Sequence, residues 1–116
     1  MTEITRETQI TPELLAEFKS EYRKIYKTTT IDGQDIYWRR LTRSDYKEIM
    51  AETEGIKDTN ERLWEREELV CRRVVVYPCK EVFDEFLREN AGTASILSDD
   101  IYEKSGFRMT SRAEEV

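Results

Sequence analysis

IYKTTTIDGQDIYWRRLTRSDYKEIM, residues 25–50, contains the change from an extended to a helical pattern that decides the fold. Its first half is rich in β-branched and aromatic residues, which favour strands. The dipeptide formed by Asp32 and Gly33 is a strong signal for a two-residue hairpin turn. We therefore predict a β-hairpin near residues 25–41.

A two-residue turn also determines which side chains share a face of the hairpin. It would place Lys27 opposite Trp38. Alternation along the second strand would then send Trp38 and Arg40 to one face and Tyr37 and Arg39 to the other. A lone hairpin is barely stable in water, so we expect one of these faces to lie on helices.

The second half of the stretch predicts the start of a helix. Thr42 and Asp45 have the spacing of a capping box, in which each side chain accepts a hydrogen bond from the other residue's backbone amide. Asp58 and Glu61 repeat this spacing further along the chain. Caps, breakers and apolar spacing predict helices from Pro12 to between Arg23 and Ile25, from Arg43 to about Thr53, from near Thr59 to Pro78, around residues 82–87, and from Thr93 to Gly106.

The segment VVVYP, residues 74–78, favours a strand by propensity alone. We predict that it continues the third helix, because the apolar stripe runs on in register and Pro78 provides a stop. The whole pattern indicates an α+β fold that is predominantly helical, with about five helices and one hairpin. We expect a flexible lead over residues 1–10, a single globular domain over residues 11–107 and a flexible tail over residues 108–116.

Charge and hydropathy restrict the partners. The 116 residues include 25 acidic and 19 basic side chains, a net charge of -6, and such a field repels phosphate and anionic lipid. The N-terminus lacks a signal-peptide pattern, and no apolar run approaches the roughly 18 residues of a membrane span. We expect a cytoplasmic protein that binds neither nucleic acid nor membrane.

The residues that carry chemistry are few. The chain contains no histidine, the commonest general base, and no glycine-rich phosphate loop. Cys71 and Cys79 lie eight residues apart without further zinc ligands, so we interpret them as reduced, partly buried thiols. Neighbouring carboxylates such as Asp99 and Asp100 point in different directions on a helix. We therefore predict no enzymatic activity, no cofactor and no metal site.

Aromatic and arginine side chains, the types that dominate interface hot spots, cluster in the second strand and after it. The candidate partner-binding residues there are Tyr37, Trp38, Arg39, Arg40 and Arg43. The alternative is that Trp38 or Tyr37 packs the hairpin onto the helices while the arginines pair with acidic side chains.

A second candidate surface lies in LVCRRVVVY, residues 69–77. Val75 and Val76 widen the apolar face of the predicted helix, which indicates either a central buried helix or a contact in a homo-oligomer. Trp64, beside the apolar stripe of the same helix, is a further partner-binding candidate.

The order of these pieces resembles a known family. A hairpin leading into IYWRRLTRSDYKEIM, then ERLWEREELVCRRVVVYP, then AGTASILSDDIYEKSGF, is similar to the small tail assembly chaperones of long-tailed bacteriophages, over roughly residues 25–107. The closest elements are an aromatic residue and arginines before LTRSDYK, a charged helix ending in VVYP, and a last helix closed by SGF.

The resemblance implies a non-enzymatic protein of the infected host's cytoplasm that is absent from the mature virion. Such chaperones bind the tape measure protein, keep it soluble and help to recruit tail tube subunits. Two alternatives stay open. One is a small structural virion protein of the baseplate or of tail completion, and the other is an acidic inhibitor of a host enzyme, whose negative charge would gather on one face.

Overall fold

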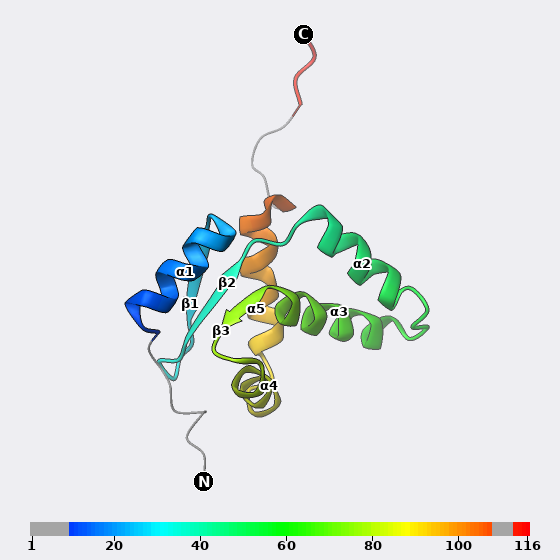
Figure 1. Ribbon diagram of the computed structural model, residues 1–116. Helices are drawn as coiled ribbons and strands as arrows, with labels where there is room; N and C mark the ends of the chain where they lie inside the picture. Colours follow the sequence, from blue (N-terminus) through cyan, green and yellow to red (C-terminus); the bar gives the residue numbers. More distant parts are fainter. Residues whose placement is uncertain (1–9, 108–112) are drawn as a thin grey trace.

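The computed structural model describes residues 10–107 and 113–116. Residues 1–9 and 108–112, on which most of the expected flexible ends fall, lie outside the described residues. The fold is α+β and predominantly helical, as predicted (Figure 1). The described elements are α1 (Pro12–Tyr22), β1 (Ile25–Thr29), β2 (Asp35–Arg39), α2 (Arg43–Thr53), α3 (Thr59–Val74), β3 (Val75–Tyr77), α4 (Lys80–Glu89), α5 (Thr93–Tyr102) and a π-helical turn (Glu103–Phe107).

The predicted hairpin is present, but its register is shifted by one residue. Its loop is three residues long, 31–33, because the amide of Thr30 donates to the carbonyl of Gln34 (2.9 Å). Gly33 has a φ of 86°, the left-handed conformation that this three-residue loop requires at its last position. Lys27 therefore pairs with Tyr37 and not with Trp38.

The prediction of helix over VVVYP is wrong. The helix α3 ends at Val74, and residues 75–77 form the short strand β3, which pairs antiparallel with β2 and gives the sheet order β1-β2-β3. Tyr37 pairs with Tyr77 and Trp38 with Val75, so an extra residue bulges between the two pairs. The free edge of β2 offers backbone hydrogen-bonding partners, which the apolar spacing along the sequence does not reveal. Residues 75–77 include two valines and a tyrosine, which favour a strand, so they pair with this edge.

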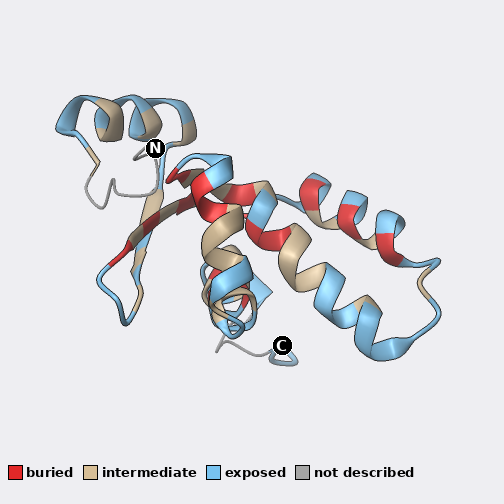
Figure 2. Cartoon of the chain, turned by 90° about the horizontal axis from the view of Figure 1, so that it is seen from below, coloured by how far each residue is buried: buried red, intermediate tan, exposed pale blue. Residues whose placement is uncertain are grey.

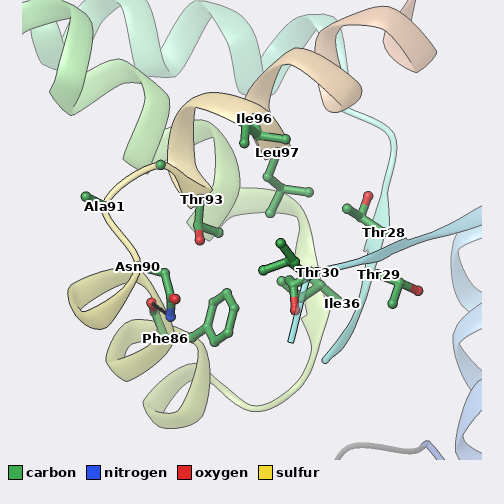
Figure 3. A pocket seen from close by; sticks show the side chains of 12 residues that line it. Thr28, Thr29, Thr30, Ile36, Phe86, Asn90, Ala91, Thr93, Ile96 and Leu97 are labelled. Carbon is green, nitrogen blue, oxygen red and sulfur yellow. Dashed lines mark hydrogen bonds between the residues drawn. The ribbon is translucent and has the colours of Figure 1, made fainter. Parts of the chain in front are cut away.

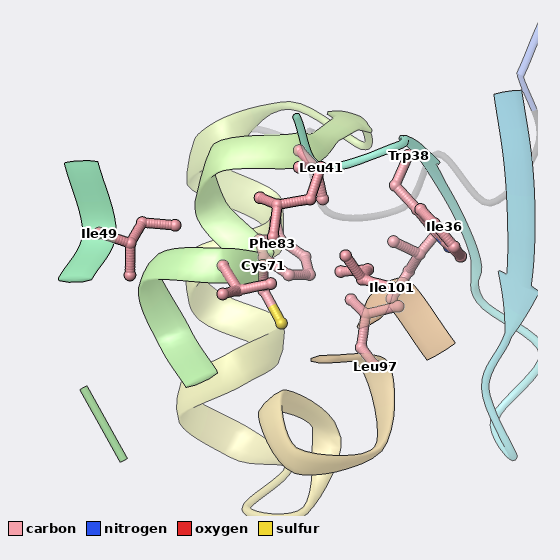
Figure 4. Packing of buried hydrophobic residues seen from close by; sticks show 10 residues of the cluster. Ile36, Trp38, Leu41, Ile49, Cys71, Phe83, Leu97 and Ile101 are labelled. Atoms are coloured by element: carbon pink, nitrogen blue, oxygen red, sulfur yellow. The ribbon is translucent and has the colours of Figure 1, made fainter. Parts of the chain in front are cut away.

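The core lies where one face of the sheet meets α3, α4 and α5. Trp38 and Ile36 reach inward from β2 and Ile101 from α5 (Figure 4), and Val70 and Val74 of α3 belong to the same buried cluster. Each of these five side chains is at most 1% exposed. The same face of the hairpin that packs the core also carries its largest aromatic side chain.

Most of the predicted helix boundaries hold. The Thr42–Asp45 capping box is formed in both directions, and Asp58 caps α3 by accepting from the amide of Glu61. The sequence also predicts that Thr93 caps the last helix with its hydroxyl, and this is wrong. Gly92 occupies the N-cap position of α5, and no side chain forms a capping hydrogen bond at this end.

The C-terminal end of the helical region closes as predicted. Gly106 adopts a φ of 96°, and Phe107 folds back so that its ring lies 4.9 Å from the rings of both Tyr46 and Tyr102. A left-handed glycine followed by an apolar residue that packs back on the helix is a common way for a helix to end. Gly106 and Phe107 in the sequence have this pattern.

Two parts of the molecule lie away from this core. The helix α1 flanks the hairpin and contributes no buried residue (Figure 2). The other part is the hairpin of α2 and the first half of α3, which extends away from the sheet (Figure 1). Ile49 and Thr53 of α2 are fully buried along this hairpin, whereas Leu63 and Trp64 of α3 are more than half exposed.

Candidate functional site

Trp38, the central residue of the predicted partner-binding cluster, is a core residue. Its side chain is 1% exposed and stacks on Tyr26 with ring centroids 4.9 Å apart. The indole N–H donates to the hydroxyl of Thr28 (3.0 Å), which satisfies its only polar group. The expectation that Trp38 lies on a binding surface is therefore corrected, and the alternative that it packs the hairpin onto the helices holds.

Arg39 belongs to a cluster of charges that joins three elements. Its Nη1 donates to Asp45 Oδ2 (2.8 Å), and its Nη2 donates to the carbonyl of Arg73 (3.1 Å). Arg73 from α3 also donates to Asp45 Oδ1 (3.2 Å) and to Glu48 (2.6 Å). The cluster ties β2, α2 and α3 together, and these contacts occupy the guanidinium of Arg39 from within the protein.

Asp45 is the centre of this cluster. Burial by itself would raise the pKa of its carboxyl group, but hydrogen bonds from Arg39 and Thr42 outweigh burial and hold the pKa well below its ordinary value of 3.8. Asp45 therefore stays ionised at neutral pH. Because all its partners are structural, the arrangement indicates a folding role and not a proton-transfer role.

The other predicted binding residues do not form one patch. Tyr37 is half-buried and packs edge-on against Tyr77, with centroids 6.1 Å apart. Arg40 and Arg43 are exposed near the start of α2, where the Arg43 guanidinium lies over the ring of Tyr46. Trp64 lies elsewhere and is 56% exposed in the first half of α3. Val75 and Val76 are half-buried in β3, which pairs with β2 next to Tyr37.

The placement of Val75 and Val76 in β3 rules out a central buried helix at these residues. Both lie at the edge of the three-stranded sheet. A role for them in a homo-oligomer stays a prediction.

A different surface has the form of a binding site. An open groove of about 420 Å³ lies between the tip of the β-hairpin and the turn that joins α4 to α5 (Figure 3). Ile36, Leu97 and Phe86 contribute apolar side chains to its lining. Two isoleucines line it as well, Ile31 from the hairpin loop (100% exposed) and Ile96 from α5 (66% exposed).

Among the residues that the structure describes, none that lines the groove is charged. The remaining lining residues are small or polar and uncharged: Thr28, Thr29, Thr30, Asn90, Ala91, Gly92 and Thr93. In a chain of which 38% of residues are charged, this is an unusual stretch of surface. Uncharged, concave and mostly apolar surfaces are typical of binding sites.

The sequence contained one signal for this groove. Ile31 stands next to the Asp32-Gly33 turn, a position where polar residues are usual. The other lining residues come from the predicted hairpin strands and from residues 86–97, for which the sequence predicts helices and a turn. Only the packing of the hairpin against α4 and α5 brings the two segments together.

The titratable and sulfur groups give no reactive arrangement. Cys71 is buried, and burial raises the pKa of its thiol to about 12, so it is a poor nucleophile. Cys79 is exposed, which corrects the expectation of partial burial, and both thiols are free. The described part of the chain holds no group of three or more His, Cys, Asp or Glu residues arranged to bind a metal ion.

Among the described residues, no helix combines the length and apolar character needed to cross a membrane. Comparisons of the chain with protein-family models, with curated proteins and with solved structures find no match. The groove and the resemblance of the sequence to tail assembly chaperones are therefore the two observations that bear on function.

Proposed function

We propose that this protein is a non-enzymatic tail assembly chaperone that binds the tape measure protein, keeps it soluble and helps to recruit tail tube subunits. One observation carries the proposal: an open, uncharged groove lined largely by apolar residues on a small, acidic protein. A long helix-forming chain exposes apolar stripes before assembly, and a groove of this kind takes such stripes by helix-in-groove recognition.

The charge of the protein supports the same role. A net charge of -6 keeps a complex soluble after the apolar groove is covered. The groove is open, so the captured segment stays partly exposed. Moderate affinity of this kind suits a chaperone that tail polymerisation must displace.

The proposal places the protein in the cytoplasm of the infected host and outside the finished particle. Pull-down of the tape measure protein from infected cells, combined with mass spectrometry of purified particles, tests both statements. We expect capture of the tape measure protein and no copy of this chain in the particles. A stoichiometric copy in the particles would instead support a structural virion protein.

A further inference from the structure

The two segments that build the groove carry more acid than base. Residues 27–36 and 86–100 include five carboxylates and two basic side chains. None of these charged side chains is among the described residues that line the groove.

One of the carboxylates, Asp100, is fixed against a lining residue on the groove side of the hairpin. The hydroxyl of Thr28 donates to Asp100 Oδ2 (3.3 Å), whereas Asp35 accepts from the hydroxyl of Thr29 (2.7 Å) on the opposite face of the hairpin from Ile36. Asp100 has no ion-pair partner among the described residues. It retains acceptor capacity one helical turn from Ile96, where a cation of a bound segment would be favoured.

The helix α1 of a second copy is a poor occupant of this site. It is amphipathic, and its apolar residues are only partly covered in its own chain. However, it carries Glu13, Glu17 and Glu21 against the single base Lys19. An acidic helix beside acidic groove margins is opposed by like-charge repulsion.

We infer that the groove takes an amphipathic helix whose apolar face is bordered by lysine or arginine residues. This inference depends on the proposed function for the helical form of the partner, and it adds the charge that the partner segment must have. Apolar side chains of the helix fill the space between Ile31 and Ile96. The basic side chains beside them reach Asp100.

Synthetic peptides of about 18 residues, long enough to form a helix, provide the probes. The first carries leucine at helical spacing with lysine at the other charged positions. The second has glutamate in place of every lysine, and the third is the lysine peptide with a central proline, which breaks the helix. Fluorescence anisotropy measures binding to the full chain, and circular dichroism confirms that each protein variant is folded.

We expect the lysine peptide to bind at least about tenfold more tightly than either the glutamate or the proline peptide. Ile31→Asp and Ile96→Asp should each weaken lysine-peptide binding by about tenfold. Leu63→Asp is the matched control, because it also replaces an exposed aliphatic residue by aspartate, on a part of α3 away from the groove. It should leave the affinity unchanged.

The charges are tested in the same way. Asp100→Asn should weaken binding several-fold and reduce its salt dependence. Asp35→Asn, which removes the same charge from the opposite face of the hairpin, is the matched control and should have a smaller effect.

Three results would overturn the inference: equal binding of the lysine and glutamate peptides, undiminished binding of the proline peptide, or equal effects of Ile96→Asp and Leu63→Asp. The proposed function fails separately, by loss of tape measure capture. If the tape measure protein is captured equally by wild type and by Ile31→Asp, Ile96→Asp, the chaperone role stands and the groove chemistry is wrong.

Discussion

Replacing Asp45 by alanine should destabilise the protein far more than replacing an exposed carboxylate of the same cluster. Asp45 is 9% exposed and accepts hydrogen bonds from Arg39, Arg73 and the backbone amide of Thr42. The substitution removes one bond of the capping box, worth about 1 kcal/mol. It also leaves the largely buried guanidinium of Arg39 without its carboxylate, which costs about 2 kcal/mol.

We therefore expect a loss of about 3 kcal/mol, a large share of the roughly 5–15 kcal/mol by which domains are stable. Urea denaturation followed by circular dichroism measures it. Glu48→Ala is the matched control, because Glu48 bonds to the same Arg73 but its side chain is 59% exposed. Its removal should cost less than about 1 kcal/mol.

The pH dependence gives a second readout of the same residue. The pKa of Asp45 is lower in the folded than in the unfolded protein. Its contribution is thus fully present above the ordinary value of 3.8 and is lost as the pH falls below that value toward the folded pKa. The stability gap between wild type and Asp45→Asn should be constant from about pH 5 to pH 8 and narrow below about pH 4. Equal losses for the Asp45 and Glu48 variants, or a gap that widens in acid, would refute the reasoning.

The remaining predictions concern the core, the hairpin loop and the thiols. Trp38→Ala should cost about 4 kcal/mol in urea denaturation, because it empties a core site, and a loss below about 1 kcal/mol would contradict its burial. Gly33→Ala should destabilise the protein by about 1 kcal/mol, because Gly33 has a φ of 86°, which strains any residue with a Cβ atom. Gly55 does not have a positive φ, so Gly55→Ala should be neutral or stabilising in the same assay. Ellman's reagent should titrate one thiol, Cys79, in the native protein and a second, Cys71, only in denaturant; two rapidly reacting native thiols would contradict the burial of Cys71.

Local signals predicted most of the fold. The Thr42 and Asp58 caps and the Gly106 stop depend on residues within one helical turn of each other, and the sequence contains all of them. Hairpin register is less local. Asp32-Gly33 is compatible with a two-residue or a three-residue loop, and the packing of Ile36 and Trp38 into the core accompanies the longer one.

The errors share a physical cause, which is that tertiary contacts decide between nearly equal local preferences. Residues 75–77 fit a helix by period and a strand by propensity, and pairing with β2 favours the strand. Trp38 and Arg39 are residue types that are common in interface hot spots. In the folded protein, however, Trp38 is buried in the core and Arg39 is bonded to Asp45. The groove joins residues more than fifty positions apart, so no single stretch of sequence shows it.

Co-expression of this chain with the longest helix-forming protein encoded beside it tests the central claim most directly. The soluble fraction of the long protein is measured alone, with wild type, with the Ile31→Asp, Ile96→Asp double variant and with Leu63→Asp. We predict that the long protein is soluble with wild type and with Leu63→Asp, and that it aggregates alone and with the double variant. If the long protein stays insoluble beside the wild-type chain, or is equally soluble in its absence, the chaperone account is contradicted.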